Sequence, residues 1–222
     1  KITHGPIPDP VSWHEYVAQG KDPVPAKFPA NGPDERFDWG PLDAADEEMD
    51  DYKVTQWTGE ALNRKFEKPF FLACGLWRPH LPWHVPRKYH DMYPPDKIAL
   101  PHANERDLED IPESGRKMVK HDDQKYVMEN DQWRQAVSAY LACVRFADEN
   151  VGRVLDALDS SPYAENTIVV LFGDHGWHLG EKLHWRKHAL WEESNRTPLM
   201  ISAPGVTNPA QCDRTVSLID IY

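Results

Sequence analysis

The feature that most constrains the fold is a long helical repeat in the second half of the chain. From Asp131 onward, apolar side chains recur at intervals of three and four residues. The positions are Trp133, Val137, Tyr140, Leu141, Val144, Val151, Val154, Leu155 and Leu158. This spacing predicts an amphipathic helix that buries one face along its length. Asn130 or Asp131 is a suitable N-cap, because a short polar side chain there can accept a hydrogen bond from the first turn.

Short apolar runs on either side of this helix predict strands. Residues 167–172 are rich in β-branched side chains, and residues 69–75 and 199–201 form further apolar runs of strand length. Helical spacing also occurs over residues 46–66, which end before Pro69. Strands and helices in this order favour an α/β fold with a mainly parallel sheet sandwiched by helices.

Three segments lack a regular pattern. Residues 1–45 are rich in Pro, Gly and Asp, which predicts a mostly irregular chain. Residues 77–86 contain three prolines, so we expect a stiff loop, neither strand nor helix, after the 69–75 strand. Ligands bind at such strand ends in open α/β sheets. Residues 87–130 are polar and indicate a surface excursion or lid, and we expect substrate specificity to reside there and in residues 5–45.

Charge and cysteine content exclude several classes of function. The 222-residue chain has a formal net charge of −11, which disfavours binding to nucleic acid. An anionic substrate must therefore be attracted by a local cluster of cations. The three widely spaced cysteines predict neither a disulfide framework nor a zinc site. No apolar run is long enough to span a membrane.

The segment after the 167–172 strand carries the clearest candidate site. It reads Gly-Asp-His-Gly, with Asp174 and His175 between two glycines. A carboxylate and an imidazole can both bind a divalent cation, and glycines allow the backbone to approach a ligand closely. The alternative, from the residues alone, is that Asp174 caps the next turn and His175 packs in the interior.

In their context, these residues resemble the sulfatase family of the alkaline phosphatase superfamily. The resembling stretches are Gly173-Asp174-His175-Gly176-Trp177-His178-Leu179-Gly180-Glu181, Trp185-Arg186-Lys187, Lys68-Pro69-Phe70-Phe71-Leu72-Ala73, Pro79-His80-Leu81-Pro82, Val151–Leu158 and Lys1-Ile2-Thr3-His4. Most sulfatases have Asp-Asn where this chain has Asp-His, and the Asp-His form is typical of a subset that includes the iduronate-2-sulfatases. The resemblance covers nearly the whole chain and implies an α/β fold of the alkaline phosphatase type.

The resemblance also implies roles for the candidate residues. Asp174 and His175 would belong to a calcium site, and Lys187 would bind an oxygen of the sulfate. His80 would bind the sulfate and protonate the leaving oxygen, a task that suits an imidazole. Residue type alone also allows purely structural interpretations. In these, Lys187 is a solvated surface lysine and His80 only braces its loop.

Four more residues take roles from the same resemblance. Lys1 and His4 would orient the formylglycine nucleophile and accept its proton, although residue type alone favours an unconstrained terminus. Trp177 and His178 are expected at the substrate entrance, where an aromatic face can stack on a sugar ring. A core position suits Trp177 equally well. Two further histidines that could line the pocket are His84 and His184.

One departure from the family pattern bears directly on activity. Sulfatases make formylglycine from a Cys/Ser-x-Pro/Ala-x-Arg motif, and none of Cys74, Cys143 and Cys212 stands in one. The family's paired N-terminal aspartates are missing too. We therefore expect residues 1–222 to be the central part of a sulfatase catalytic domain, truncated at both ends and inactive alone.

The expected function is hydrolysis of sulfate esters on a sugar or glycosaminoglycan, with Ca²⁺ as cofactor. The alternatives are a phosphonate monoester or phosphodiester hydrolase of the same superfamily, and an inert anion-binding fragment. The expected partners are a sulfated carbohydrate, or another small sulfate ester, and the missing N-terminal segment of the same enzyme. Sulfatases of this kind are exported or lysosomal, so we expect a targeting signal upstream of Lys1.

Overall fold

The computed structural model describes residues 11–18 and 20–221, which divide into two compact units. Unit 1 takes in the described residues up to Leu100, together with Tyr126–Pro162. Unit 2 takes in Pro101–Lys125 and the described residues from Tyr163 onward. The division falls inside helix α4, His121–Glu129.

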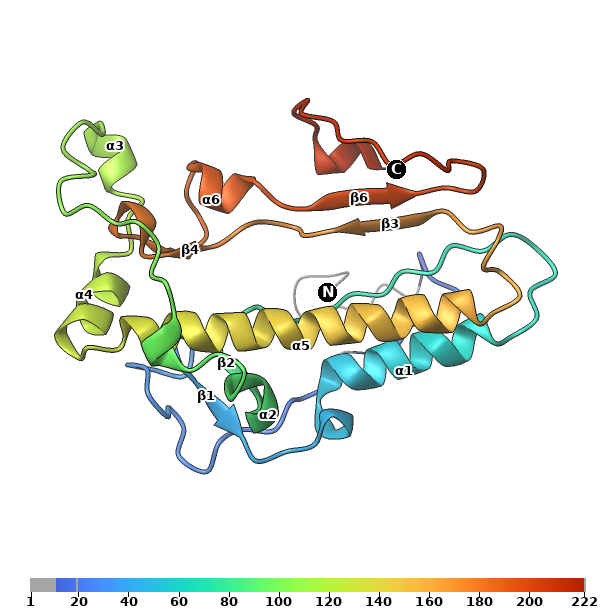
Figure 1. Ribbon diagram of the computed structural model, residues 1–222, viewed down its shortest axis with the longest axis horizontal. Helices are drawn as coiled ribbons and strands as arrows, with labels where there is room; N and C mark the ends of the chain where they lie inside the picture. Colours follow the sequence, from blue (N-terminus) through green and yellow to red (C-terminus); the bar gives the residue numbers. More distant parts are fainter. Residues whose placement is uncertain (1–10, 19, 222) are drawn as a thin grey trace. The chain divides into compact units, whose positions relative to one another are not determined.

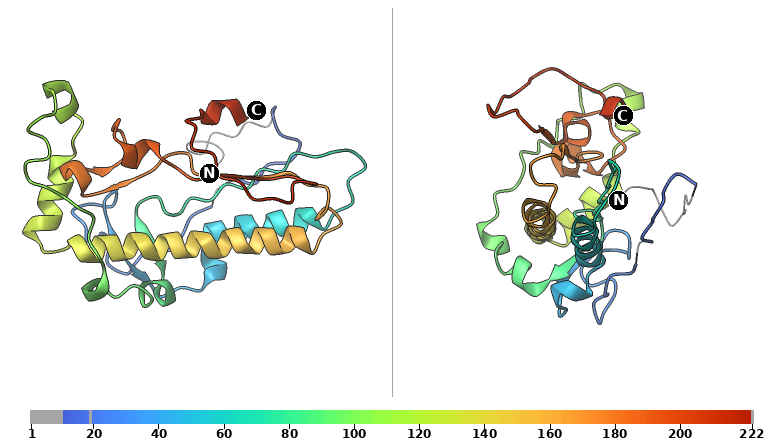
Figure 2. Two further views of the ribbon diagram at one scale, coloured as in Figure 1. Left: turned by 45° about the horizontal axis from the view of Figure 1, so that its top comes forward. Right: turned by 90° about the vertical axis from the view of Figure 1, so that its right-hand side faces the viewer.

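Two helices form the frame of unit 1. Helix α1, Asp50–Leu62, lies alongside helix α5, Trp133–Asp159, as Figure 1 and both views of Figure 2 show. A buried hydrogen bond of 3.1 Å from Thr55 Oγ1 to Asn150 Oδ1 joins the two helices. The helix predicted within residues 46–66 is confirmed.

The long helix expected from Asp131 is also confirmed, but its start differs in detail. Its N-cap is Gln132, which makes no capping hydrogen bond through its side chain. The expectation of Asn130 or Asp131 as the cap is therefore wrong. Asp131 instead has a positive φ of 52°, a conformation that a short polar side chain tolerates, and it turns the chain between α4 and α5.

Unit 1 also contains a parallel pair of strands that the sequence did not predict. Strand β1, Trp39–Leu42, pairs with β2, Trp83–Pro86, so that Trp39 lies opposite Trp83. The first strand arises within residues 1–45, and the second corrects the expectation that residues 77–86 form only a loop. Pro86 is tolerated because each strand of a two-stranded sheet is an edge strand.

Aromatic side chains fix this strand pair against α5. Phe37 packs edge-on against Trp39, with ring centroids 5.3 Å apart, and Trp83 packs in the same way against Tyr140 of α5 at 5.5 Å. Phe37, Trp39 and Trp83 are buried. The short helices that complete unit 1 are η1 (Asp46–Glu48), α2 (Arg87–His90) and η2 (Pro95–Lys97).

The predicted strand at residues 69–75 is not formed. Among the described residues this segment pairs with no other strand, and the Phe71 side chain is 70% exposed. A strand buried on both faces needs neighbouring strands to satisfy its backbone.

Unit 2 is made of two antiparallel strand pairs and short helices. Strand β3 (Val169–Phe172) pairs with β6 (Leu199–Ser202), and β4 (His178–Leu179) pairs with β5 (Trp185–Arg186). The helices are α3 (Glu113–Arg116), η3 (Glu181–Leu183), α6 (Glu192–Asn195) and η4 (Leu218–Ile221).

The strands expected at residues 167–172 and 199–201 are thus confirmed as β3 and β6. Their antiparallel pairing differs from the expected parallel arrangement, because the connection between them holds a hairpin and short helices, whereas a parallel crossover is usually a long helix. Across the described ranges, only β1 and β2 pair in parallel. No described helix is long and apolar enough to cross a membrane.

Candidate active site

Four of the predicted site residues lie together in unit 2: Asp174, His175, Trp177 and Lys187. The Lys187 Nζ atom lies 2.8 Å from His175 Nε2, and His175 Nε2 lies 3.6 Å from Asp174 Oδ1. The ammonium donates to His175 Nε2, so the ring carries its proton on Nδ1, which donates to the Gly176 carbonyl at 2.8 Å. Lys187 Nζ also lies 5.8 Å from the centre of the Trp177 ring, within the range of a cation–π contact.

The hairpin of β4 and β5 brings these residues together. Asp174 and His175 follow β3, and the hairpin then reverses the chain so that Lys187 returns to the level of Trp177. The sequence interpretation that Lys187 belongs with the Asp-His pair is therefore consistent with the local structure. Residue spacing alone did not establish this proximity.

The two residues before Lys187 are both anchored to helix α4. Trp185 is fully buried and donates from Nε1 to Gln124 Oε1 at 2.6 Å. Arg186 makes a bidentate ion pair with Asp123, at 2.6 and 2.8 Å. Of the Trp-Arg-Lys group, Lys187 is the member whose side chain reaches His175.

The glycines around the Asp-His pair serve the packing of the chain itself. A Cβ added at Gly173 would lie 2.3 Å from Thr197 Oγ1, and one at Gly176 would lie 2.0 Å from the Glu193 carbonyl oxygen. Gly176 also donates from its backbone N–H to the Ser194 carbonyl at 2.8 Å. These positions are restricted to glycine because the segment before β6 packs directly against them.

His178 and His184 form a buried pair in unit 2. Their rings meet edge to face, with centroids 4.8 Å apart, and both are fully buried. The sequence analysis expected His178 at a solvent-facing entrance to the substrate site, and this expectation is wrong because the side chain is buried. His184 accepts a hydrogen bond at Nδ1 from the Lys120 N–H and donates from Nε2 to the Lys187 carbonyl at 3.2 Å.

The electrostatic setting keeps this pair neutral. Burial, followed by the neighbouring His178, lowers the pKa of His184 to about 4. Burial also lowers the pKa of His178. A neutral His184 has one donor and one acceptor, which is what its two contacts require. We infer that His184 holds the backbone of Lys187 in place rather than lining a pocket.

The fit of calcium can be judged from the donor atoms. Calcium takes six to eight oxygen ligands, and Asp174 supplies one carboxylate while Lys187 engages His175 Nε2. In the ranges 11–18 and 20–221, no three His, Cys, Asp or Glu side chains are grouped as a metal site would require. The described residues therefore do not form a calcium site by themselves, and calcium binding stays a prediction.

His80 belongs to unit 1, on the loop before β2. Its Nδ1 donates to the Leu81 carbonyl at 2.8 Å, and its ring lies against that of Trp77, with centroids 4.6 Å apart. Because Nδ1 is the donor in this contact, Nε2 is the nitrogen that gains a proton when the ring becomes an imidazolium. The side chain is half-buried.

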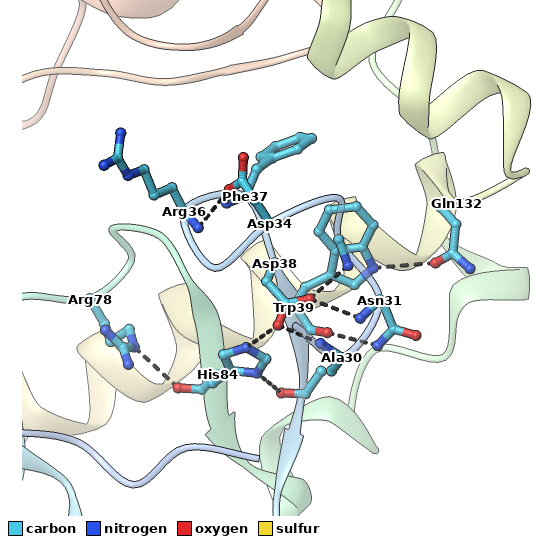
Figure 3. Close-up of polar contacts among 12 residues, drawn as sticks. Ala30, Asn31, Asp34, Arg36, Phe37, Asp38, Trp39, Arg78, His84 and Gln132 are labelled. Carbon is cyan, nitrogen blue, oxygen red and sulfur yellow. Dashed lines mark hydrogen bonds and ion pairs between the residues drawn. The ribbon is translucent and has the colours of Figure 1, made fainter. Parts of the chain in front are cut away.

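A second polar cluster braces the other end of the same loop (Figure 3). The buried carboxylate of Asp38 accepts hydrogen bonds from His84 Nε2 at 2.9 Å and from the backbone N–H groups of Ala30, Asn31 and Gly32 at 2.6–2.8 Å. Burial alone raises the pKa of Asp38, but these four hydrogen bonds outweigh it and hold the pKa well below its usual range.

His84 links two segments of the chain, in addition to any part that it takes in a pocket wall. Its Nδ1 lies 2.9 Å from the Gly40 carbonyl, so both ring nitrogens contact acceptors. The link joins β2 to the segment before β1 and to β1 itself. Sequence reasoning missed Asp38, because a single aspartate in an irregular segment carries no local pattern.

A cavity of about 400 Å³ in unit 1 lies beside this loop. Its lining combines residues 20–24, Phe28, Glu35, Arg36, Asp50, Trp77, Arg78, Pro82 and His84. Much of the lining thus comes from residues 5–45, where the sequence analysis expected specificity to reside. Lys1 and His4 lie outside the described residues.

Comparison with known proteins adds a family context to these contacts. The model of the sulfatase family matches residues 11–222. A sulfatase from Formosa agariphila is 42% identical over 188 residues, covering 83% of this chain and 37% of that protein. The iduronate 2-sulfatase of Mus musculus is 35% identical over 186 residues, covering 76% of this chain and 34% of that protein.

A solved structure of known fold is also similar to this chain. The phosphonate monoester hydrolase from Silicibacter pomeroyi superposes with a TM-score of 0.64 at 24% identity, covering 75% of this chain and 35% of that chain. The α/β fold of the alkaline phosphatase type is thereby confirmed. The chain spans about a third of the length of the curated relatives that it matches.

Proposed function

Because this chain belongs to the sulfatase family, we propose that the enzyme containing it hydrolyses sulfate esters carried on a sugar. The observation that carries the proposal is the Lys187 ammonium, held 2.8 Å from His175 Nε2 and beside Asp174. A fixed cation is suited to an anionic group whose charge shifts during reaction. The similarity to an iduronate 2-sulfatase supports a sugar as the alcohol part of the ester.

In the proposed reaction, water cleaves the bond between sulfur and the ester oxygen. Lys187 binds a non-bridging sulfuryl oxygen and stabilises its charge. His80, as an imidazolium, donates its Nε2 proton to the departing sugar oxygen, which otherwise leaves as a poorly stabilised alkoxide. The family's formylglycine nucleophile is not encoded in a Cys/Ser-x-Pro/Ala-x-Arg motif among these 222 residues, so no step is assigned to it.

Surrounding residues support the two roles by holding these groups. Trp185, Arg186 and His184 restrict the position of Lys187 through their hydrogen bonds. The 400 Å³ cavity beside the His80 loop offers room for a sugar ring. Export or lysosomal targeting and calcium dependence belong to the same proposal.

The test is hydrolysis by the active enzyme of a sugar sulfate, nitrophenyl sulfate and a phenylphosphonate monoester. We expect kcat/KM to favour the sulfate esters, whereas a preference for the phosphonate would replace the proposal with the phosphonate hydrolase alternative. His80→Ala should lower kcat/KM on the sugar sulfate by about 10²–10⁴-fold. It should affect nitrophenyl sulfate far less, because that leaving group needs little protonation.

The exposed His121 at the start of α4 provides a matched control. His121→Ala should leave both sulfate substrates unaffected. Equal losses on both substrates in His80→Ala would make His80 a sulfate anchor and not the acid.

A further inference from the structure

The loop that carries His80 has little regular structure of its own. Residues 77–82 include Pro79 and Pro82, which lack a backbone donor. The turn is closed by one backbone hydrogen bond of 3.0 Å, from the His80 N–H to the Trp77 carbonyl. Trp83 Nε1 also donates to the Pro79 carbonyl at 2.9 Å. The position of His80 therefore depends in part on what holds residues 77 and 78, where the turn begins.

A buried carboxylate holds both of these residues. Asp51, the second residue of α1, accepts from the Trp77 N–H at 2.6 Å through Oδ1 and from the Arg78 N–H at 2.9 Å through Oδ2. Its exposure is only 4%. Each oxygen thus binds one of two successive backbone N–H groups, and this geometry fixes the direction of the backbone as well as its position.

The Arg78 side chain adds a second anchor on the same stretch. Its Nη2 donates to Asp22 Oδ2 at 2.5 Å, and its Nε donates to the His84 carbonyl at 3.2 Å. The loop is therefore held at its start by Asp51 and across its span by Arg78. His80 follows the turn directly, with its ring against Trp77.

We infer that Asp51 is a positioning residue for His80: it sets the backbone of residues 77 and 78 so that the imidazole reaches the leaving oxygen. The inference rests on the proposed function of His80 as the acid. Asp51 touches no substrate in this account, so its effect must pass through His80. A displacement of a catalytic group by about 1 Å can cost on the order of 10²-fold in rate.

The variant that tests this is Asp51→Asn in the active enzyme. The amide keeps the shape of the carboxylate, but its NH₂ group faces one of the two N–H donors and cannot accept from it. We expect kcat/KM on a sugar sulfate to fall by about 10–100-fold, through kcat rather than KM. On nitrophenyl sulfate, the change should be less than about threefold, because that substrate scarcely uses the acid.

Asp46→Asn is the matched control. Asp46 is an equally buried aspartate of unit 1, but it accepts from Tyr89 Oη at 2.8 Å and Lys88 Nζ at 2.7 Å rather than from the loop. It should lower stability without changing the ratio of the two substrates. A double variant sharpens the test: once His80→Ala is present, Asp51→Asn should have no further effect on the sugar sulfate.

A readout that needs no turnover separates this inference from the proposed function. In NMR spectra of histidine-labelled enzyme, the His80 ring signals should shift in Asp51→Asn and stay in place in Asp46→Asn. Unchanged His80 signals, equal losses on both substrates, or an undiminished effect in the His80→Ala background would each overturn the inference. Absence of sulfate release by the wild-type enzyme would instead overturn the proposed function, and the His80 signals would still decide the role of Asp51.

Discussion

The two units hold their candidate residues in different ways. In unit 1, buried side chains make the contacts of the His80 loop: Asp51 and Arg78 hold its first half, and Asp38 with His84 hold its second. In unit 2, the hydrogen bonds of Trp185, Arg186 and His184 hold the chain around Lys187. The Asp174 side chain, by contrast, is 63% exposed. The difference shows that buried side chains brace the loop of the proposed proton donor at both ends, whereas the proposed anion site is only partly built from the described residues.

The largest effect should follow from a change at Asp174, the exposed candidate residue of unit 2. Asp174→Ala in the active enzyme should abolish calcium-dependent activity, because a bound cation would lose its anionic ligand. The measurement is sulfate release with a calcium chelator and after calcium is restored. Asp213→Ala, at an exposed aspartate of unit 2, should leave activity intact. Full activity of Asp174→Ala in the presence of chelator would mean that Lys187 binds the sulfate group without a metal ion.

The next effect concerns the cation itself. Lys187→Ala should lower kcat/KM on sugar and aryl sulfates alike by about 10²–10³-fold, the order expected when a preorganised charge stabiliser is removed. Lys182→Ala is the matched control in unit 2, since Lys182 forms an ion pair with Asp107 at 2.8 Å instead of contacting His175. Similar kinetics for both variants would remove Lys187 from the proposed site.

Loss of a phenylalanine side chain should destabilise the protein more in unit 1 than in unit 2. Phe146 of α5 is fully buried, whereas Phe172 of β3 is 42% exposed. Phe146→Ala should lower the free energy of unfolding by about 3–5 kcal/mol through lost burial and a cavity. Phe172→Ala should cost about 1 kcal/mol or less. Urea unfolding of the active enzyme measures both, and equal costs would show that β3 is covered in the folded enzyme.

The smallest effect is a pH dependence of unit 1. Burial, together with the nearby His84 and Arg87, lowers the pKa of His90 to about 4. The unfolded chain binds a proton at a pKa of about 6.5, so between these values unfolding takes up a proton and stability falls as the pH falls. His90→Gln should remove roughly 1–2 kcal/mol of the loss between pH 7 and pH 5, as measured by urea unfolding. A pH slope in His90→Gln equal to that of the wild-type enzyme would contradict this prediction.

The sequence by itself determined the elements whose signal is local. The three-and-four spacing identified α5 and α1, and the apolar runs before Asp174 and around Leu199 identified β3 and β6. The motifs around His80, Asp174 and Lys187 were sufficient to indicate the family, which the family match confirmed. These features depend on residues close together in the chain, so their patterns are visible without a fold.

Only the tertiary structure decided what depends on distant partners. Asp51 and Asp38 are ordinary acidic residues in the sequence, and they gain a role because residues 77–84 lie against them. His178 looked like a surface residue beside Trp177, yet the hairpin buries it against His184. A strand also needs a neighbour, so residues 69–75 form no strand while residues 83–86 form β2. Hydrogen bonds and burial are set by three-dimensional proximity, which no local pattern encodes.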